Sequence, residues 1–278
     1  MERLKAALDK ARASRARTEA GASLASARGG GRQRANADAV AAAWRELTRM
    51  EVDPQRLRWR RLVALSGGTE AAAFDLLRTK VLQLAAANNW KRIGVTSPLA
   101  GSGKTTTSIN LAISLARQVD LRVVLMDMDM RRPAVAKAFG RSGTSSVADV
   151  LMRHQTFAGN AHRIGENLAI AMNHTRLRDP SDLFLRRSTS EVLREIEETY
   201  QPDIMLFDLP PALVNDDAQA LLDKLDAVII VAEAGSSTIS QIDVCEKELA
   251  EQTNILGIVL NKCRFQSDGY GHYDYDYS

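Results

Sequence analysis

From Trp90 onward, short apolar runs alternate with longer stretches of helical periodicity. This alternation is typical of βαβ units, in which helices join parallel strands. The expected strands are Ile93–Thr96, Arg122–Met126, Leu168–Ala171, Ile204–Phe207, Ala227–Val231 and Ile255–Leu260. The expected helices are Lys104–Arg117, Ser188–Tyr200, Asn215–Lys224 and Thr238–Glu251. The pattern therefore predicts an α/β fold with a mostly parallel sheet flanked by helices.

The N-terminal part of the chain lacks this alternation. Residues 1–17 have the composition of a helix with a narrow apolar stripe. Residues 21–37 contain three consecutive glycines and no periodicity, which predicts a flexible linker. A short helical stretch over residues 39–50 is expected to be broken by Asp53-Pro54.

A longer helix is expected over Thr69–Ala87, where apolar residues recur with helical spacing. After Cys263 the apolar pattern ends, and the last residues are expected to form a mobile tail. We therefore divide the chain into a basic helical arm with its linker (1–61), an α/β domain (62–264) and a C-terminal tail (265–278).

Positive charge is concentrated in the arm. Residues 1–61 hold 15 Lys/Arg against 7 Asp/Glu, a net charge of +8, whereas the remaining residues hold 22 against 27, a net charge of −5. Such an arm suits an anionic lipid surface, an acidic protein partner or nucleic acid. The alternative interpretation is a solvated arm without a dedicated ligand.

The composition also indicates a compartment. No apolar run approaches the roughly 18 residues that a membrane-spanning helix needs, and the first twenty residues do not form a signal peptide. Cys245 and Cys263 are too few for a disulfide framework or a four-ligand zinc site. We therefore expect a cytoplasmic protein that reaches a membrane only through a partner.

The strongest motif is TSPLAGSGKTTTSINLA (96–112), between an expected strand and an expected helix. Its glycines allow backbone N–H groups to surround a phosphate, to which the helix N-terminus adds positive charge. Lys104 is expected to reach the β and γ phosphates, and the Thr105 hydroxyl to bind Mg²⁺. Pro98 stands where the strict pattern has its first glycine. The nucleotide-binding residues predicted here are Ala100, Gly101, Ser102, Gly103, Lys104, Thr105 and Thr106.

Acidic residues end two further expected strands. Asp127 and Asp129 follow VVLM, and Asp208 follows IMLF. Ligands of open α/β sheets gather at the carboxyl ends of strands, so these carboxylates are candidates for magnesium binding and catalysis. Alternatively, a single such residue can be a helix cap or a solvated turn. Arg131 and Arg132, which come next, either neutralise phosphoryl charge or cap the strand end.

Tyrosine is concentrated at the C-terminus. Four of the five tyrosines, Tyr270, Tyr273, Tyr275 and Tyr277, lie within the last nine residues, and only Tyr200 lies elsewhere. Phosphorylation of all four would add about −6 to −8 charges to an already acidic segment. We expect this charge to expel the segment from an aspartate-lined site and to loosen an oligomer.

The phosphate loop, the DMDMRRP strand end, the FDLPP strand end and the tyrosine cluster together resemble the bacterial tyrosine kinases of capsule and exopolysaccharide systems. The resemblance covers residues 62–278 and implies the fold of MinD/ParA ATPases, with ATP and Mg²⁺ as cofactors. It implies that one aspartate of the DMD pair removes the proton of a tyrosine hydroxyl, and we assign this role to Asp127. Asp129 and Asp208 then support the metal with Thr105. The division of roles between Asp127 and Asp129 stays open.

The resemblance also implies autophosphorylation of the C-terminal tyrosines between subunits of a homo-oligomer, and control of polysaccharide polymerisation and export. The implied partners are a separate membrane co-polymerase that activates the kinase and a tyrosine phosphatase. The oligomerisation motif ExxRxxR of the family corresponds here to Ala72, Asp75 and Arg78, of which only the last matches. Asn261 either contacts adenine, as in related ATPases, or closes a turn.

Two other functions use the same motifs. A MinD/ParA-like positioning ATPase would use the same fold as a switch without kinase activity. Proteins of that type usually carry a signature lysine where this chain has Leu99. A nucleotide-binding scaffold phosphorylated by another enzyme is the third possibility. The histidines show no metal-ligand spacing, and the three tryptophans are expected to pack rather than to stack on bases, so no nucleic-acid partner is expected.

Overall fold

The structure is a computed structural model that describes residues 36–263. The chain divides into two compact units, Met1–Arg45 and Glu46–Ser278. The described part of the first unit is helical. The expected helix over residues 1–17, most of the glycine linker and the tail with its four tyrosines lie outside the described residues.

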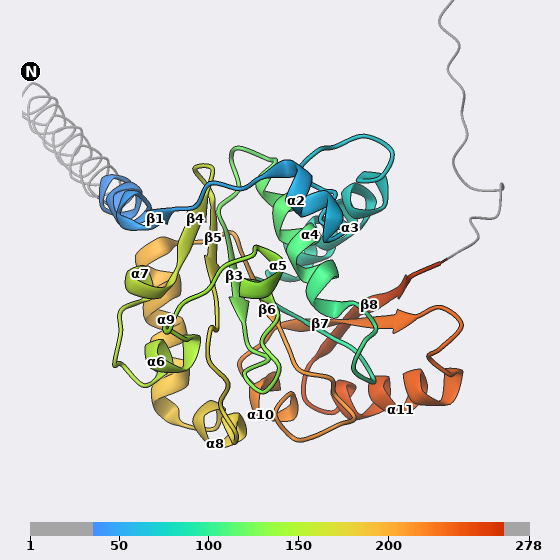
Figure 1. Cartoon of the computed structure of the whole chain (residues 1–278). Helices are drawn as coiled ribbons and strands as arrows, with labels where there is room; N and C mark the ends of the chain where they lie inside the picture. The colour runs from blue at the N-terminus through green and yellow to red at the C-terminus, as the bar shows by residue number, and fades with distance from the viewer. Residues whose placement is uncertain (1–35, 264–278) are drawn as a thin grey trace, which may run out of the picture. The chain divides into compact units, whose positions relative to one another are not determined.

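The second unit is built on one eight-stranded sheet with the order β1-β4-β5-β3-β6-β2-β7-β8 (Figure 1). The strands are β1 (Thr48–Arg49), β2 (Arg92–Thr96), β3 (Val123–Asp127), β4 (His162–Ile164), β5 (Leu168–Ala171), β6 (Ile204–Asp208), β7 (Ala227–Glu233) and β8 (Asn254–Asn261). Neighbouring strands are parallel except β4 and β5, which pair antiparallel. The predicted α/β fold with a mostly parallel sheet is therefore confirmed.

The helices connect these strands. They are α2 (Pro54–Trp59), α3 (Ala72–Asn88), α4 (Lys104–Ala116), α5 (Val135–Ala138), α6 (Val147–Leu151), α7 (Phe157–Asn160), α8 (Pro180–Phe184), α9 (Arg187–Tyr200), α10 (Gln219–Leu222) and α11 (Ile239–Ala250). The sequence predicted α3, α4, α9 and α11 to within a few residues. The helix predicted over Asn215–Lys224 is shorter, because Asp217 lies in a loop and binds Arg131 instead.

The second unit includes α2 and the turn that follows it. The Asp53 side chain accepts a hydrogen bond from the backbone of Gln55, and Pro54 occupies the first turn of α2. The preceding helix ends at Glu46, before β1, so the expectation that Asp53-Pro54 breaks it is wrong. Asp53-Pro54 instead starts α2, because proline fits the first helical turn. Leu57 and Leu62 are buried in the core, whereas Trp59 is 90% exposed, so the expectation that Trp59 packs is wrong.

The helix α4 lies across β2, β3 and β6 and is covered by α3 (Figure 1). Asn110, buried in its middle, accepts hydrogen bonds from the backbones of Val63 and Ala64 at 2.8 and 3.0 Å. Its amide donates to the carbonyls of Arg61 and Thr106, both at 2.9 Å. One buried side chain thus fixes residues 61–64 to α4, and with them the entry into the α/β domain.

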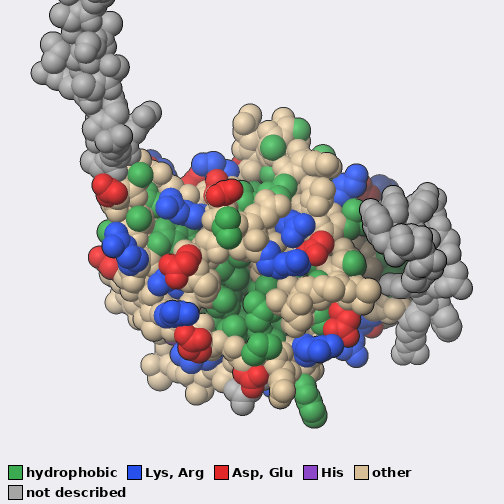
Figure 2. Space-filling view, turned by 90° about the horizontal axis from the view of Figure 1, so that it is seen from above, with side chains coloured by type: hydrophobic (Ala, Val, Ile, Leu, Met, Phe, Trp, Pro, Cys, Tyr) green, Lys and Arg blue, Asp and Glu red, His purple; other side chains and the backbone are tan. Residues whose placement is uncertain are grey.

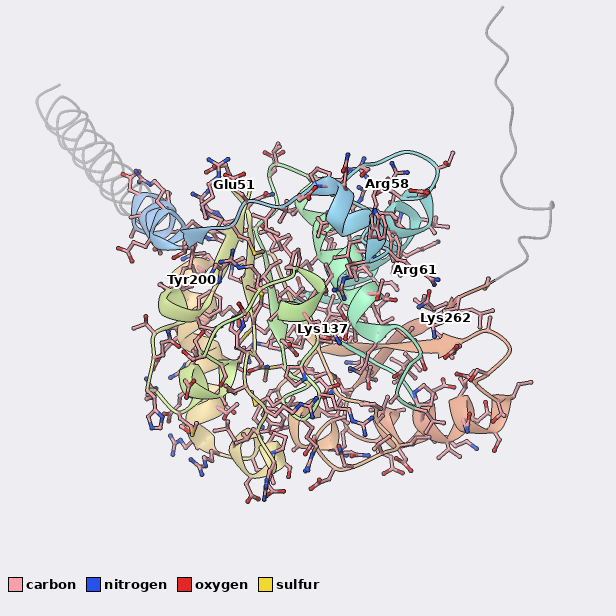
Figure 3. All side chains as sticks on the ribbon, viewed as in Figure 1. Glu51, Arg58, Arg61, Lys137, Tyr200 and Lys262 are labelled. Carbon is pink, nitrogen blue, oxygen red and sulfur yellow. The ribbon has the colours of Figure 1, made fainter. Side chains whose placement is uncertain are left out.

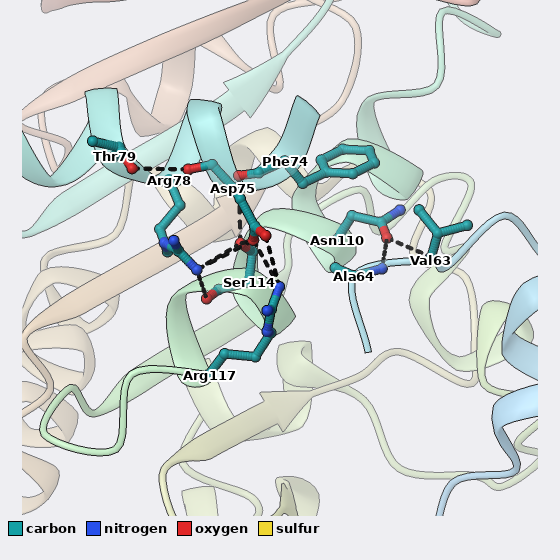
Figure 4. A network of polar contacts seen from close by, with 9 residues as sticks. All are labelled: Val63, Ala64, Phe74, Asp75, Arg78, Thr79, Asn110, Ser114 and Arg117. Carbon is teal, nitrogen blue, oxygen red and sulfur yellow. Dashed lines mark hydrogen bonds and ion pairs between the residues drawn. The ribbon is translucent and has the colours of Figure 1, made fainter. Parts of the chain in front are cut away.

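A polar network joins α3 to the C-terminal end of α4 (Figure 4). The Ser114 hydroxyl donates to Asp75 at 2.6 Å, and Arg117 donates to both oxygens of the same carboxylate at 2.8 Å. Arg78 contacts Asp75 at 3.2 Å and the Ser114 carbonyl at 3.3 Å. Asp75 and Arg78, which align with the oligomerisation motif of the resembled family, are therefore engaged within one chain.

The surface in Figure 2 carries basic and acidic side chains interspersed among hydrophobic and polar ones. Trp59, Val119 and Ile239 are among the exposed large hydrophobic residues. Across residues 36–263, none of the helices combines the length and apolar content that crossing a bilayer requires.

Candidate active site

The loop between β2 and α4 has the backbone of a phosphate cradle. Gly101 and Gly103 have φ values of +94° and +89°, a region that favours glycine. A side chain at Gly103 is also sterically excluded, because its Cβ would lie 2.2 Å from the Asn261 amide nitrogen. That amide donates to the Ser102 carbonyl at 2.9 Å. Asn261 therefore braces the phosphate loop, a role that neither sequence interpretation included.

Lys104 begins α4 and is almost fully buried. Its Nζ donates to Asp129 Oδ2 at 2.7 Å, in an ion pair whose two side chains are 10% and 6% exposed. Burial lowers the pKa of Lys104, but the charges of Asp208 and Asp129 raise it, and the net pKa shift is upward. The lysine is therefore held in its charged form.

Asp127 and Asp208 end the adjacent strands β3 and β6, at positions paired in the sheet register, and are fully buried. Asp208 Oδ1 accepts from the Ser108 hydroxyl at 3.1 Å, and Asp127 Oδ2 from the Val135 backbone at 3.3 Å. Within residues 36–263, their second oxygens, Asp208 Oδ2 and Asp127 Oδ1, have no hydrogen-bond partner. Buried carboxylate oxygens without partners are costly and indicate a ligand or a catalytic role.

Burial raises the pKa of both carboxyl groups. The pKa of Asp127 lies well above its ordinary value of 3.8, through burial first and the charge of Asp208 second. Burial also raises the pKa of Asp208, against the opposing charge of Lys104 and a hydrogen bond from Thr105. Perturbed carboxyl groups of this kind cluster at functional sites, because their position is maintained against an energetic cost.

A cavity of about 420 Å³ lies over these groups. Its lining residues are Ala100, Gly101, Gly103, Lys104, Thr105, Thr106, Asp129, Arg131, Arg132, Ala134, Pro210, Pro211, Val214 and Asn215. The structure thus brings Asp129 and all the predicted loop residues except Ser102 together around the cavity. Asp127, Asp208, Ser102 and Asn261 are not in the lining, and lie behind it or beside it.

Several lining residues carried a weak signal in the sequence. Arg131 donates to the buried Asp217 with two nitrogens, one at 3.1 Å, which favours the structural interpretation for this arginine. Arg132 stays exposed, and its backbone N–H donates to Asp129 Oδ1 at 3.0 Å. Pro210 and Pro211 were visible only as the end of the FDLPP motif.

A second cavity, of about 790 Å³, lies next to Asn261. It is lined by Arg61, Lys262, Cys263 and the turn of residues 233–236 that follows β7. Lys262 pairs with Glu233 at 2.9 Å, and Figure 3 shows Arg61 and Lys262 on neighbouring elements.

The donor set suits magnesium but not a metal held by protein alone. In the part of the chain that the structure describes, no cluster of three or more His, Cys, Asp or Glu side chains is arranged around a common metal position. Magnesium binds through one or two protein oxygens plus phosphate and water. The Thr105 hydroxyl and the unpartnered oxygen of Asp208 fit this requirement.

Comparison with known proteins agrees with this site. Residues 90–254 match the family described as AAA domain. The chain is 28% identical over 203 residues to the tyrosine-protein kinase YwqD of Bacillus subtilis, which covers 72% of this chain and 84% of that protein. It is 29% identical over 184 residues to the tyrosine-protein kinase CpsD of Streptococcus pneumoniae, which covers 65% of this chain and 80% of that protein.

Two solved structures have a fold similar to that of this chain. The kinase domain of VpsO superimposes with a TM-score of 0.63 at 28% identity, over 74% of this chain and 97% of that domain. The septum site-determining protein MinD of Pyrococcus horikoshii, solved with Mg-ADP, superimposes with a TM-score of 0.51 at 21% identity, over 61% of this chain and 69% of that protein. The predicted P-loop fold of the MinD/ParA type is therefore confirmed.

Proposed function

The chain belongs to the AAA domain family as a protein-tyrosine kinase of the bacterial type, and from this premise we propose that it transfers the γ-phosphoryl group of ATP to its own C-terminal tyrosines. One observation carries the proposal: Lys104 and the carboxylates of Asp127, Asp129 and Asp208 converge at the phosphate loop, and two buried carboxylate oxygens there lack partners. A phosphate loop alone is compatible with any nucleotide-binding protein. The additional carboxylates favour a protein that also activates a hydroxyl group for phosphoryl transfer.

ATP and magnesium supply the phosphoryl group and the charge that neutralises it during transfer. Residues 100–106 would hold the phosphates through their N–H groups, and Lys104 would place its charge on them. Thr105, Asp129 and Asp208 would hold the magnesium ion. The base of the nucleotide would lie toward the cavity beside Asn261, with Asn261 keeping the phosphate loop in place.

The acceptor hydroxyl needs a base, because a tyrosine with a pKa near 10 is a poor nucleophile at neutral pH. We assign this role to Asp127, whose Oδ1 has no partner within the described residues and whose raised pKa favours proton uptake. Asp127 is fully buried and does not line the cavity, so the site has to rearrange before a tyrosine reaches this carboxylate. Asp129, which lines the cavity, is the competing candidate.

The proposed acceptors are Tyr270, Tyr273, Tyr275 and Tyr277, phosphorylated by a neighbouring subunit of a homo-oligomer. Names of similar proteins, such as CapB of Staphylococcus aureus, suit the proposed role in capsule or exopolysaccharide polymerisation and export. The chain would act at the cytoplasmic face of the membrane, bound to a separate co-polymerase, with a tyrosine phosphatase reversing the reaction. The solved chimera CapA2B2 shares the fold at a TM-score of 0.66 and 22% identity.

Incubation of the purified full chain with γ-labelled ATP and Mg²⁺ tests the proposal. We expect label on tyrosine, no label in Lys104→Met, and no label when all four C-terminal tyrosines are changed to Phe. Label retained in Lys104→Met identifies a contaminating kinase. ATP hydrolysis without labelling favours a MinD/ParA-like switch instead, and neither activity favours a scaffold.

A further inference from the structure

A basic surface borders the phosphate cavity on the side of the loop that follows β5. Arg131 lines both that cavity and a neighbouring one of about 390 Å³, whose other lining residues are Arg176, Leu177, Arg178 and Asp179. We refer to Arg131, Arg176 and Arg178 as the arginine rim. Asp217 neutralises Arg131, so the positive charge of this cavity comes from Arg176 and Arg178, which outweigh the single carboxylate of Asp179 and favour an anionic ligand.

The rim is fixed to the active site at several points. The Asn173 amide donates to the Asp127 carbonyl at 2.6 Å, at the start of the loop. The Leu177 N–H donates to the Met130 carbonyl at 3.0 Å, between the two loop arginines. Arg131 is held by Asp217. The loop therefore keeps Arg176 and Arg178 beside the strand end that carries the catalytic aspartates.

Arg176 and Arg178 have no carboxylate partner within residues 36–263. Both side chains are exposed, and no ion pair or hydrogen bond links either guanidinium to a carboxylate of residues 36–263. Arg153, by contrast, is an exposed arginine that pairs with Glu195 at 2.7 Å. Arginine binds carboxylates with two parallel hydrogen bonds, so two uncommitted arginines next to the cavity suit an acidic peptide.

We propose that the arginine rim binds the aspartates that flank the acceptor tyrosines of a second copy of this chain, and so delivers the tyrosine hydroxyl to the cavity. This inference rests on the proposed kinase function. The sequence Tyr273-Asp-Tyr-Asp-Tyr277 places an aspartate directly beside each of its three tyrosines. Tyr270, by contrast, lies between two glycines.

The two-residue repeat of this segment matters for recognition. A shift by two residues replaces one tyrosine with the next and one aspartate with the next, so the same contacts present several acceptors in turn. Tyr270 gains no such contact. The rim therefore predicts a preference among the acceptors: Tyr273, Tyr275 and Tyr277 depend on Arg176 and Arg178, and Tyr270 does not.

The test uses a synthetic peptide of residues 264–278 as substrate for the full chain, with steady-state measurement of kcat and KM. We expect the double variant Arg176→Gln/Arg178→Gln to raise KM about tenfold and to leave kcat unchanged, since exposed arginine–carboxylate pairs contribute to binding rather than to the transfer step. The matched control is Arg187→Gln/Arg194→Gln, which removes two exposed arginines of α9 and should leave KM unchanged.

The peptide supplies the complementary change. A peptide carrying Asp274→Asn and Asp276→Asn should show the same tenfold rise in KM with the wild-type protein and no further rise with the rim variant. Mass spectrometry should find Tyr270 phosphorylated equally by both proteins. Equal KM values for the rim variant and its control, or independent effects of the peptide and rim changes, would overturn the proposal.

A failure of the kinase function is recognised separately. If the wild type phosphorylates nothing, the proposed function fails. Fluorescence anisotropy of the labelled peptide then tests, independently of kinase activity, whether the arginine rim binds the peptide. The rim is supported if the wild type binds the peptide and the rim variant binds it at least fivefold more weakly. Equal peptide affinity in both proteins, with loss of binding only to phosphatidylserine vesicles, assigns the rim to a lipid surface and rejects our proposal.

Discussion

The two ends of α4 each carry a cluster of charged residues, and the clusters are built in opposite ways. At the N-terminal end, Lys104 faces three carboxylates, and two oxygens of Asp127 and Asp208 lack partners within the described residues. At the C-terminal end, both oxygens of Asp75 accept hydrogen bonds, which come from Ser114, Arg117 and Arg78. One cluster contains unsatisfied acceptors, and the other has a carboxylate that is fully satisfied.

The pKa values shift in opposite directions at the two ends. A hydrogen bond from Ser114, followed by the hydrogen bond and charge of Arg117, lowers the pKa of Asp75 against the effect of burial. Burial instead raises the pKa of Asp127 and Asp208. A carboxylate with a lowered pKa is stabilised in its charged form by its partners in the protein, as in a contact that holds helices together. A carboxylate with a raised pKa is destabilised in that form, which is typical of a group that binds a cation or takes up a proton in function. We therefore interpret the first cluster as catalytic and the second as structural.

The largest expected effect comes from neutral substitutions at the catalytic end. Asp127→Asn removes the proposed base and should lower the rate of autophosphorylation about 10²- to 10⁴-fold. Because it also removes a buried negative charge, it should raise the free energy of unfolding by about 1 kcal/mol in the absence of nucleotide. Radiolabelled ATP assays and urea unfolding measure the two effects.

Asp129→Asn is the comparison variant for the base assignment. If Asp129→Asn loses the transfer step and Asp127→Asn keeps it, the roles of the two aspartates are exchanged. If Asp127→Asn is less stable than wild type, the buried carboxylate of Asp127 does not destabilise the folded protein. The contrast between the two ends of α4 would then be wrong.

The second effect is a loss of stability without loss of activity. Asp75→Asn leaves Arg78 and Arg117 without their carboxylate, and should lower the free energy of unfolding by about 1–3 kcal/mol. The rate of autophosphorylation should stay within twofold of wild type, measured well below the unfolding temperature. Ser114→Ala, which removes one donor and keeps the charges, should cost about 1 kcal/mol. A tenfold loss of activity in Asp75→Asn at unchanged stability would instead assign this end to assembly of the active kinase.

Sequence patterns predicted the parts of the molecule that depend on local order. Six strands, α4 and the phosphate loop follow from apolar runs and glycines that lie close together in the chain; the strands are β2, β3, β5, β6, β7 and β8. The acidic strand ends were also recognisable, because parallel strands bring their carboxyl ends to one edge of the sheet. The family resemblance then implied their roles as magnesium ligands and as the base.

The remaining features depend on pairings between residues far apart in the chain, which no local pattern encodes. Arg131 binds Asp217, and Asn261 braces Ser102 across 159 positions. β4 is a three-residue strand that pairs antiparallel with β5, too short to be distinguished from a loop. Asp75 looked like a degraded oligomerisation motif, and only the positions of Ser114 and Arg117 reveal its structural role.

The third effect is a difference in pH dependence. Asp127 has a folded pKa above its ordinary value, so it takes up a proton more readily when folded, and its contribution to stability is lost as the pH rises through the folded pKa. The stability gained by Asp127→Asn should therefore increase as the pH is raised from 5. Thermal unfolding at pH 5 to 9 measures this gain.

Asp75 provides the control for this pH series. Its folded pKa is below its ordinary value of 3.8, so its contribution is present above that value and is lost only as the pH falls through the folded pKa. The deficit of Asp75→Asn should therefore be constant from pH 5 to 9. Parallel pH profiles for the two variants would contradict the opposite shifts from which the two clusters were distinguished.

The smallest effect is expected at the outer edge of the structural cluster. The Arg117 side chain is 39% exposed, so its ion pair with Asp75 is screened by water and salt. Arg117→Gln should lower the free energy of unfolding by about 0.5 kcal/mol, and the difference should shrink further in 1 M salt. Urea unfolding at low and high salt measures it, with Arg153→Gln, which breaks an exposed pair, as the control. A loss as large as that of Asp75→Asn would mean that Arg117, rather than the buried hydrogen bond from Ser114, holds the two helices together.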